Sequence, residues 1–173
     1  MKSLRESLLD DDLVEKTDKM IKDEIEKFLK ANYNGTIKIS QKPNADGKYE
    51  VSSVTYIEVK NRNITSLANR MFIWTIVNGS FWISYCNSLK SLEGSPKEVG
   101  GDFYCSSCQS LKSLKGAPKK VRGEFYCDYN NSLKSLDGAP KEVGRDFYCS
   151  NCDGQFTIED VKKITNVKKG IVR

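Results

Sequence analysis

The sequence predicts a mainly β protein, a parallel β solenoid with short, non-helical return legs and a capping helix (an α+β chain overall). Three observations support this fold class. Residues 87–152 contain three copies of a 22-residue segment that align without gaps. Apolar and polar residues alternate around a conserved-looking "FYC" in each copy, which is typical of a half-buried strand. Each copy also has a glycine followed two residues later by a proline, which marks a corner.

The three copies read "NSLKSLEGSPKEVGGDFYCSSC", "QSLKSLKGAPKKVRGEFYCDYN" and "NSLKSLDGAPKEVGRDFYCSNC". Upstream, "WTIVNGSFWISYC" keeps the same register, and "YIEVKNRNITSL" is a degenerate copy. We therefore expect the solenoid to occupy residues 54–156 in about four to five turns. A single copy buries too little apolar surface to offset its conformational entropy, so the turns must stabilise one another through parallel, in-register pairing.

Residues 22 positions apart are expected to lie directly above one another in such a coil. The first interior column consists of Phe81, Phe103, Phe125 and Phe147. The second consists of Ile83, Cys105, Cys127 and Cys149, and the third of Cys86, Cys108, Asn130 and Cys152. A short strand followed by Asn or Cys and by regularly spaced leucines resembles the leucine-rich repeat. Return segments such as "KGAPKK" are too short for a helix, so we expect a flatter coil than the helix-backed horseshoe that this resemblance implies.

Two of the copies contain a C-x-x-C pair, which is half of a typical zinc site. However, Cys105 shares its column with Ile83, and Cys108 shares its column with Asn130, so neither position requires a metal ligand. The two pairs also lie much further apart than the usual interval of about 15–20 residues. We expect no cofactor, and interpret the first cysteine as a small buried residue and the second as a cap for backbone groups. A zinc-stabilised scaffold remains an alternative.

The segments that flank the repeat are predicted to cap its open ends. In residues 1–53 we expect a helix that starts at Thr17 or Asp18 and is stopped by Asn34–Gly35, followed by a hairpin of "TIKIS" and "KYEVSSV". The apolar face of this helix is predicted to consist of Met20, Ile21, Ile25, Phe28 and Leu29. In residues 157–173 we expect a helix that begins at Thr157, with Asp160 in a capping box, and then a short strand or tail.

The candidate site is the outward face of the predicted strands. Its central column is aromatic and consists of Trp82, Tyr104, Tyr126 and Tyr148. A column of carboxylates runs beside it and consists of Asp102, Glu124 and Asp146. Such a surface suits a protein partner that offers Arg or Lys. The alternative is that like residues stack only for stability. Two columns of lysines are interpreted as a solvated face, and the alternative is that they contact phosphate or membrane headgroups. The first column is Lys90, Lys112 and Lys134, and the second is Lys97, Lys119 and Lys141.

Several functional classes are disfavoured by the composition. The chain has no histidine, its serines lack a general base, and no phosphate-binding glycine motif occurs, so we expect no enzyme and no small-molecule substrate. The net charge is +5, but Lys and Glu are interleaved and the carboxylates would repel phosphate, so nucleic acid is not the expected partner, and a nucleic-acid binder or mimic is kept as a further alternative. No apolar run is long enough for a membrane span. The start "MKSLRESLLDDD" does not read as a secretory signal, so we expect a cytoplasmic protein with reduced thiols.

The repeat "SLKSLEGSPKEVGGDFYC" also resembles short repeat arrays that are encoded by bacteriophages of gut bacteria and by related bacterial genomes. The likeness extends to the start of the chain and to the ending "FTIEDVKKITNVKKG". This resemblance implies a phage or bacterial protein-interaction module that acts in the host cytoplasm. Both an inhibitor of a host defence system, such as an anti-CRISPR, and a structural or virion-associated scaffold are compatible with it.

Overall fold

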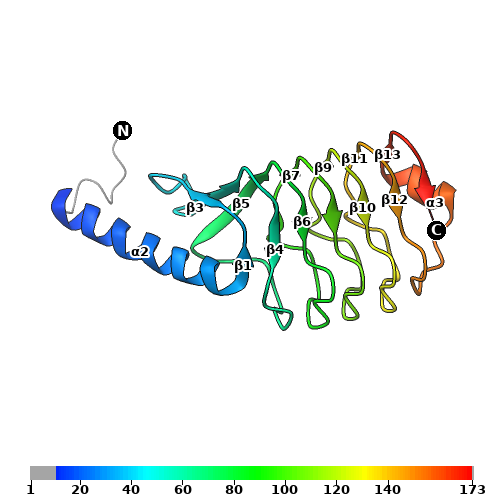
Figure 1. The fold of residues 1–173 in the computed structure, drawn as a ribbon, viewed down its shortest axis with the longest axis horizontal. Coiled ribbons are helices and arrows are strands. Elements are labelled where there is room, and N and C mark those ends of the chain that lie inside the picture. Colours follow the sequence, from blue (N-terminus) through cyan, green and yellow to red (C-terminus); the bar gives the residue numbers. More distant parts are fainter. Residues whose placement is uncertain (1–10, 173) are drawn as a thin grey trace.

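The computed structural model describes residues 11–172, which form an elongated β solenoid with a long helix at one end (Figure 1). The elements at the N-terminal end are helix α2 (Asp11–Asn32), strand β1 (Tyr33–Asn34) and a hairpin of β2 (Ile37–Ile39) and β3 (Tyr49–Ser53). Those at the other end are helix α3 (Ile158–Ile164), β13 (Asn166–Val167) and β14 (Ile171–Val172). The two helices therefore lie at opposite ends of the coil (Figure 1).

Each turn of the coil contributes one strand to each of two sheets. Sheet A has the order β1, β4 (Ile57–Val59), β6 (Phe81–Trp82), β8 (Phe103–Tyr104), β10 (Phe125–Tyr126), β12 (Phe147–Tyr148), β14. Sheet B has the order β13, β11 (Glu142–Val143), β9 (Lys120–Val121), β7 (Glu98–Val99), β5 (Phe72–Val77), β3, β2. Strands β4 to β14 of sheet A pair in parallel, and Phe81, Phe103, Phe125 and Phe147 are register partners. The predicted solenoid with non-helical return legs is confirmed.

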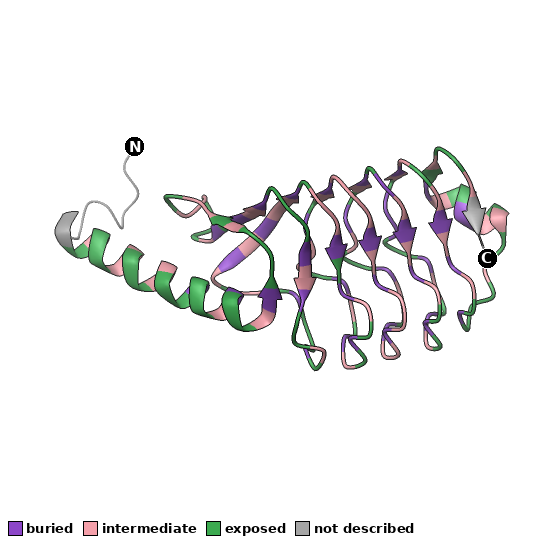
Figure 2. Ribbon diagram, in the orientation of Figure 1, coloured by how far each residue is buried: buried purple, intermediate pink, exposed green. Residues whose placement is uncertain are grey.

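Sheet B was not expected as a separate layer. In the copies it is formed by the two-residue strands β7, β9 and β11, within a segment that the sequence indicates only as a return leg. Val99 and Val121 pair in register and point inward, fully buried. The interior of the coil thus lies between two sheets, and Figure 2 shows the buried residues along their strands.

The interior columns lie where the 22-residue period places them. The four phenylalanine rings are fully buried, with ring centroids 5.8, 5.4 and 5.0 Å apart from Phe81 to Phe147. Ile83, Cys105 and Cys127 are also fully buried, so cysteine and isoleucine occupy equivalent interior positions. These contacts confirm that residues one period apart stack directly.

Glycine is required at the corners of the coil. Gly94, Gly116 and Gly138 have φ values of 93°, 87° and 86°, in a region that L side chains rarely adopt. A Cβ atom on Gly116 would lie 2.2 Å from the backbone nitrogen of Glu93 in the preceding turn. The glycine therefore supplies both the left-handed conformation and the close approach of adjacent turns.

The turn position after β8, β10 and β12 is occupied by a hydrogen-bond donor that reaches the preceding coil. Cys108 Sγ donates to the Ile83 carbonyl at 3.1 Å, and Cys152 Sγ donates to the Cys127 carbonyl at 3.2 Å. Asn130 Nδ2 makes the equivalent bond to the Cys105 carbonyl at 3.0 Å. In all three cases the acceptor lies 25 residues earlier in the chain. Cysteine and asparagine are thus interchangeable caps of the same backbone group, as the sequence indicates.

Asn130 makes two further bonds, which leads to a prediction. Its Nδ2 also donates to the Cys127 carbonyl at 2.7 Å, and its Oδ1 accepts from the Cys108 amide at 2.6 Å. Asn130→Ala leaves the Cys105 carbonyl and the Cys108 amide buried without this partner, whereas the Cys127 carbonyl still accepts from Cys152 Sγ, and it is expected to lower the free energy of unfolding by about 3 kcal/mol. Asn130→Cys keeps one donor and should cost about 1 kcal/mol. Urea denaturation followed by circular dichroism measures both; equal losses would contradict the equivalence of the two caps.

The N-terminal helix differs from its prediction at its start. Helix α2 begins at Asp11 rather than at Thr17 or Asp18, whereas it ends at Asn32, before the Asn34–Gly35 pair that is predicted to stop it. Thr17 lies inside the helix, where its Oγ1 donates to the Leu13 carbonyl at 2.8 Å instead of capping an N-terminus.

The predicted apolar face of α2 is correct only towards its C-terminal end. Ile25 and Leu29 are buried, and Ile21 and Phe28 pack against the core. The inclusion of Met20 was wrong, because its side chain is 72% exposed. Adjacent helical residues point about 100° apart, so a helix that packs Ile21 and Ile25 against the core leaves Met20 facing outward.

The C-terminal helix is capped as predicted. The Asp160 amide donates to Thr157 Oγ1 at 3.1 Å, and the Thr157 amide donates to Asp160 Oδ2 at 2.9 Å. This reciprocal pair is a capping box, and it fixes the start of α3 where the last full coil ends.

Candidate protein-docking face

The outer face of sheet A carries a row of stacked rings, here called the aromatic row: Trp82, Tyr104, Tyr126 and Tyr148. Side chains that alternate with the buried phenylalanines must point outward, which places one ring on each of β6, β8, β10 and β12. Successive ring centroids are 4.3, 4.6 and 4.4 Å apart, and the tyrosine planes are within 7° of parallel. Trp82 is 43% exposed, whereas the tyrosines are half-buried.

This stacking changes what the row offers to a partner. Tyr104 and Tyr126 each have a neighbouring ring on both faces, so only their edges and hydroxyls remain accessible. A cation from a partner cannot lie over a face that another ring already covers. Tyr104 and Tyr126 therefore cannot form the cation–π contact with a partner that the sequence predicts.

Two of the three predicted carboxylates are engaged within the sheet. Asp102 Oδ1 accepts the Glu124 amide at 2.8 Å, and Asp102 Oδ2 accepts the Tyr104 hydroxyl at 3.1 Å. The Tyr126 hydroxyl donates to Glu124 in the same way. The carboxylate of Asp146 accepts no hydrogen bond from any residue between 11 and 172, although its backbone carbonyl accepts the Phe125 amide at 3.0 Å. Asp102 and Glu124 thus fix the ring stack and the strand register.

The phenols of the row are hydrogen-bond donors at neutral pH. Desolvation by burial, followed by the charge of Asp102, raises the pKa of Tyr104 to about 12. Desolvation and the hydrogen bond to Glu124 raise the pKa of Tyr126 as well. Both hydroxyls therefore keep their protons and hold the adjacent carboxylates.

A groove of about 330 Å³ runs beside the aromatic row. Trp82, Tyr104 and Tyr126 form one wall. The remaining lining consists of Glu58, Arg62, Ser84, Tyr85, Ser106 and Asp128. Arg62 closes one end, because its Nη2 lies 2.7 Å from Glu58 Oε1 and its Nη1 donates to the Ser84 carbonyl at 2.7 Å. The groove thus combines aromatic edges, small hydroxyl side chains, an Arg62–Glu58 ion pair and the carboxylate of Asp128.

Two residues of this face were missed from the sequence. Tyr85 and Tyr129 are 65% and 55% exposed and have positive φ values of 65° and 57°. Ser107 and Asn151 hold the same position and conformation in the other two copies. The available signal was a tyrosine directly before the turn residue in "SYC" and "DYN", where the other copies have a small polar residue.

All six cysteines are buried thiols that form no disulfide. Burial raises the pKa of Cys108 to about 12 and holds the pKa of Cys105 and Cys127 well above the ordinary thiol value. These thiols are therefore protonated, which suits their role as hydrogen-bond donors to backbone carbonyls. Across residues 11–172, no group of three or more His, Cys, Asp or Glu side chains is arranged to hold a metal ion.

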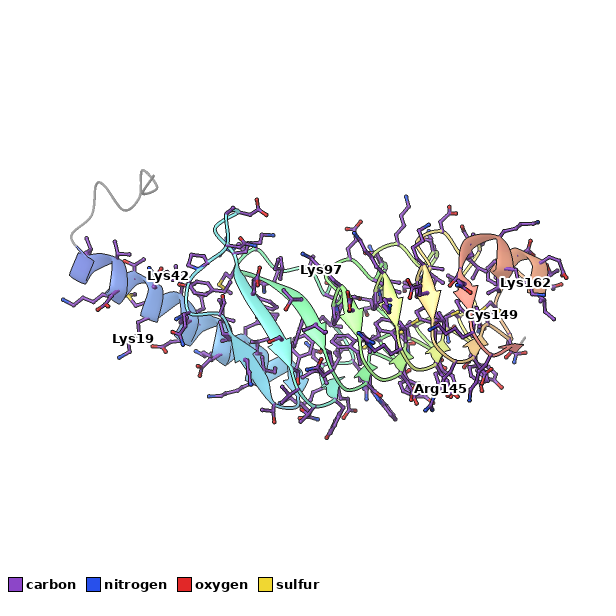
Figure 3. The ribbon with its side chains drawn as sticks, turned by 90° about the horizontal axis from the view of Figure 1, so that it is seen from above. Lys19, Lys42, Lys97, Arg145, Cys149 and Lys162 are labelled. Carbon is purple, nitrogen blue, oxygen red and sulfur yellow. The ribbon has the colours of Figure 1, made fainter. Side chains whose placement is uncertain are left out.

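The lysine columns are exposed, and Figure 3 shows Lys97 at the surface of the coil. Next to them on sheet B, Lys120 Nζ lies 2.8 Å from Glu142 Oε2 in the neighbouring turn. Basic and acidic residues thus alternate along this side. No helix in the described part of the chain has the length and hydropathy to cross a membrane.

The fold and this face define a class of protein: a two-sheeted, parallel β solenoid of 22-residue coils with a stacked aromatic row on one outer face. Comparisons with models of protein families, with curated proteins and with solved structures found no match to the chain.

Proposed function

We propose that this protein is a non-enzymatic protein-interaction module that binds its partner through the outer face of sheet A. The groove beside the aromatic row is the observation that carries the proposal. Trp82 and Tyr85 are exposed in the lining of this groove, and Tyr129 is exposed two turns beyond Tyr85. Tryptophan and tyrosine contribute most of the binding energy in many protein interfaces, because each buries a large area at a small entropic cost.

The biological setting is proposed from the resemblance of the repeat to phage and bacterial arrays. On this proposal the chain is encoded by a phage and binds a host or phage protein in the host cytoplasm, for example as an inhibitor of a defence system. A non-enzymatic role is supported by the protonated state of the buried thiols, since a nucleophilic cysteine requires a thiolate.

Affinity capture from a host lysate tests the face. The test variant is Ser106→Lys, which places a long side chain in the groove but leaves the ring stack and the backbone bond from Tyr85 to the Ser106 carbonyl unchanged. We expect it to lose at least tenfold of the captured partner. A second variant changes the four residues of the aromatic row to serine and should lose the partner completely. The matched control changes Lys97, Lys119 and Lys141 to serine.

Both test variants must first melt as cooperatively as the unchanged protein. Full capture by folded Ser106→Lys protein, with the lysine variant losing the partner instead, would reject the face. Because Asp102 and Glu124 are engaged in the sheet, the second candidate function is a virion-associated or other structural scaffold. The scaffold function is favoured if none of the variants captures a partner and the protein is found in purified virus particles.

A further inference from the structure

We propose that the gap above Ser107, between Tyr85 and Tyr129, is a binding site for an arginine side chain of the partner protein. This inference rests on the proposed function and names the chemical group that the partner supplies. It concerns the turn residues that follow the strands, beginning with Tyr85 in the lining of the groove, and not the aromatic row. Neighbouring rings cover the faces of Tyr104 and Tyr126, so a cation cannot bind over these two rings. The proposed cation site therefore lies elsewhere on this face.

Tyr85, Ser107 and Tyr129 occupy the same place in three successive turns. Their backbones are joined in the ladder, since the Tyr85 amide donates to the Ser106 carbonyl at 3.0 Å and the Ser107 amide to the Asp128 carbonyl at 3.1 Å. Tyr85 and Tyr129 are therefore two strand spacings apart, about 9.6 Å. One planar group inserted between them would lie about 4.8 Å from each, as in a regular stack.

The aromatic row shows what a filled stack looks like, with rings 4.3 to 4.6 Å apart. The column of turn residues Tyr85, Ser107 and Tyr129 has no ring in the middle, because its middle residue is Ser107. Neither Tyr85 nor Tyr129 takes part in any ring contact formed within residues 11–172, and both are more than half exposed. Their ring faces are thus available to a ligand, unlike those of Tyr104 and Tyr126.

The turn itself does not require tyrosine at these positions. All members of this column are in the left-handed region, where bulky residues are uncommon, and Ser107 and Asn151 adopt it with smaller side chains. Two exposed tyrosines in this strained conformation are therefore costly for the fold. A binding role for the rings accounts for their presence.

The charge beside the gap selects the ligand. Asp128 precedes Tyr129, lines the groove and forms no ion pair within the described part of the chain. The other groove carboxylate, Glu58, is already paired with Arg62. A group that is planar, positively charged and rich in N–H donors fits both the gap and Asp128, and the guanidinium of arginine has all three properties. Lysine lacks the plane, and an aromatic ring lacks the charge.

The site is tested with N-acetyl-arginine amide as the probe, by ¹H–¹⁵N NMR titration of the full chain. We expect saturable shifts of the amides of Tyr85, Ser107, Asp128 and Tyr129, with a dissociation constant in the millimolar range. N-acetyl-citrulline amide, which is planar but neutral, and N-acetyl-lysine amide should each bind at least about threefold more weakly. Equal binding of all three probes, or no shift of these amides with the arginine probe, would overturn the assignment.

Three variants sharpen the test. Ser107→Tyr fills the gap without removing any group of the site, and should abolish the arginine-dependent shifts. Asp128→Asn should weaken binding by about two- to fivefold, as expected for an exposed ion pair. Asn151→Ser, one turn beyond Tyr129, is the control and should bind normally. Unchanged binding by folded Ser107→Tyr protein would contradict the site.

The titration and the capture experiment fail independently. If the probe does not bind but Ser106→Lys still loses the captured partner, the arginine site is wrong and the docking face stands. If the probe binds as expected but the groove variants capture the partner normally, the arginine pocket exists and the proposed docking face is wrong.

Discussion

Replacement of Phe125 by alanine is expected to lower the free energy of unfolding by about 3–5 kcal/mol. Phe125 is fully buried, and its ring lies between those of Phe103 and Phe147 at 5.4 and 5.0 Å. The truncation removes the ring from the middle of the column and leaves a cavity that the paired strands on either side cannot fill without losing register. Urea denaturation followed by far-ultraviolet circular dichroism measures the loss.

The control for this change is Lys119→Ala in the same copy of the repeat. Lys119 is exposed, and its replacement should alter stability by no more than about 0.5 kcal/mol. If Phe125→Ala cost as little as the lysine variant, the phenylalanine column would not be the core of the coil.

Alkaline pH is expected to destabilise the protein steeply. In the unfolded chain the thiols titrate near pH 9, whereas burial keeps the pKa of Cys105 and Cys127 well above this value and raises that of Cys108 to about 12. Above pH 9 the unfolded state therefore binds fewer protons than the folded state, and stability falls as pH rises. Each protected thiol contributes about 1.4 kcal/mol per pH unit, so these three together lower stability by about 4 kcal/mol per unit.

Denaturation midpoints measured under reducing conditions between about pH 8 and 10.5 test this dependence. Lysines and tyrosines also titrate in this range, so the informative quantity is the difference from a variant without the thiols. Cys105→Val with Cys127→Val removes two of the three groups, and Ile83 shows that the column accepts an aliphatic side chain. The variant should lose stability more slowly with pH by about 3 kcal/mol per unit. Parallel curves for the two proteins would refute the prediction.

The regular part of the fold was predictable because the sequence repeats it. Once Phe103, Phe125 and Phe147 align at one period, stacking of the copies fixes their environment, and the equivalence of Cys108 with Asn130 follows from the alignment. The capping box at Thr157 was predictable for a different reason, since it depends only on residues three apart. The direction of the aromatic row follows from strand alternation.

The remaining features depend on contacts that no local pattern encodes. Strands β7, β9 and β11 contain two residues each, too few for alternation to show, and they exist because adjacent turns pair. Met20 was included on helical spacing, but the buried side of α2 contains Ile21 and Ile25, and Met20 lies outside it. The covered faces of Tyr104 and the open faces of Tyr85 result from ring spacing, which depends on whether neighbouring copies share the same residue.

The bond from the turn residue to the carbonyl 25 positions earlier joins each of the three copies in residues 87–152 to the coil before it in the same way. Insertion or deletion of one 22-codon unit in the gene would therefore recreate a junction of the same chemistry. Related genes are expected to differ in length by whole units while both termini stay unchanged. Their products would then differ chiefly in how far the recognition surface reaches.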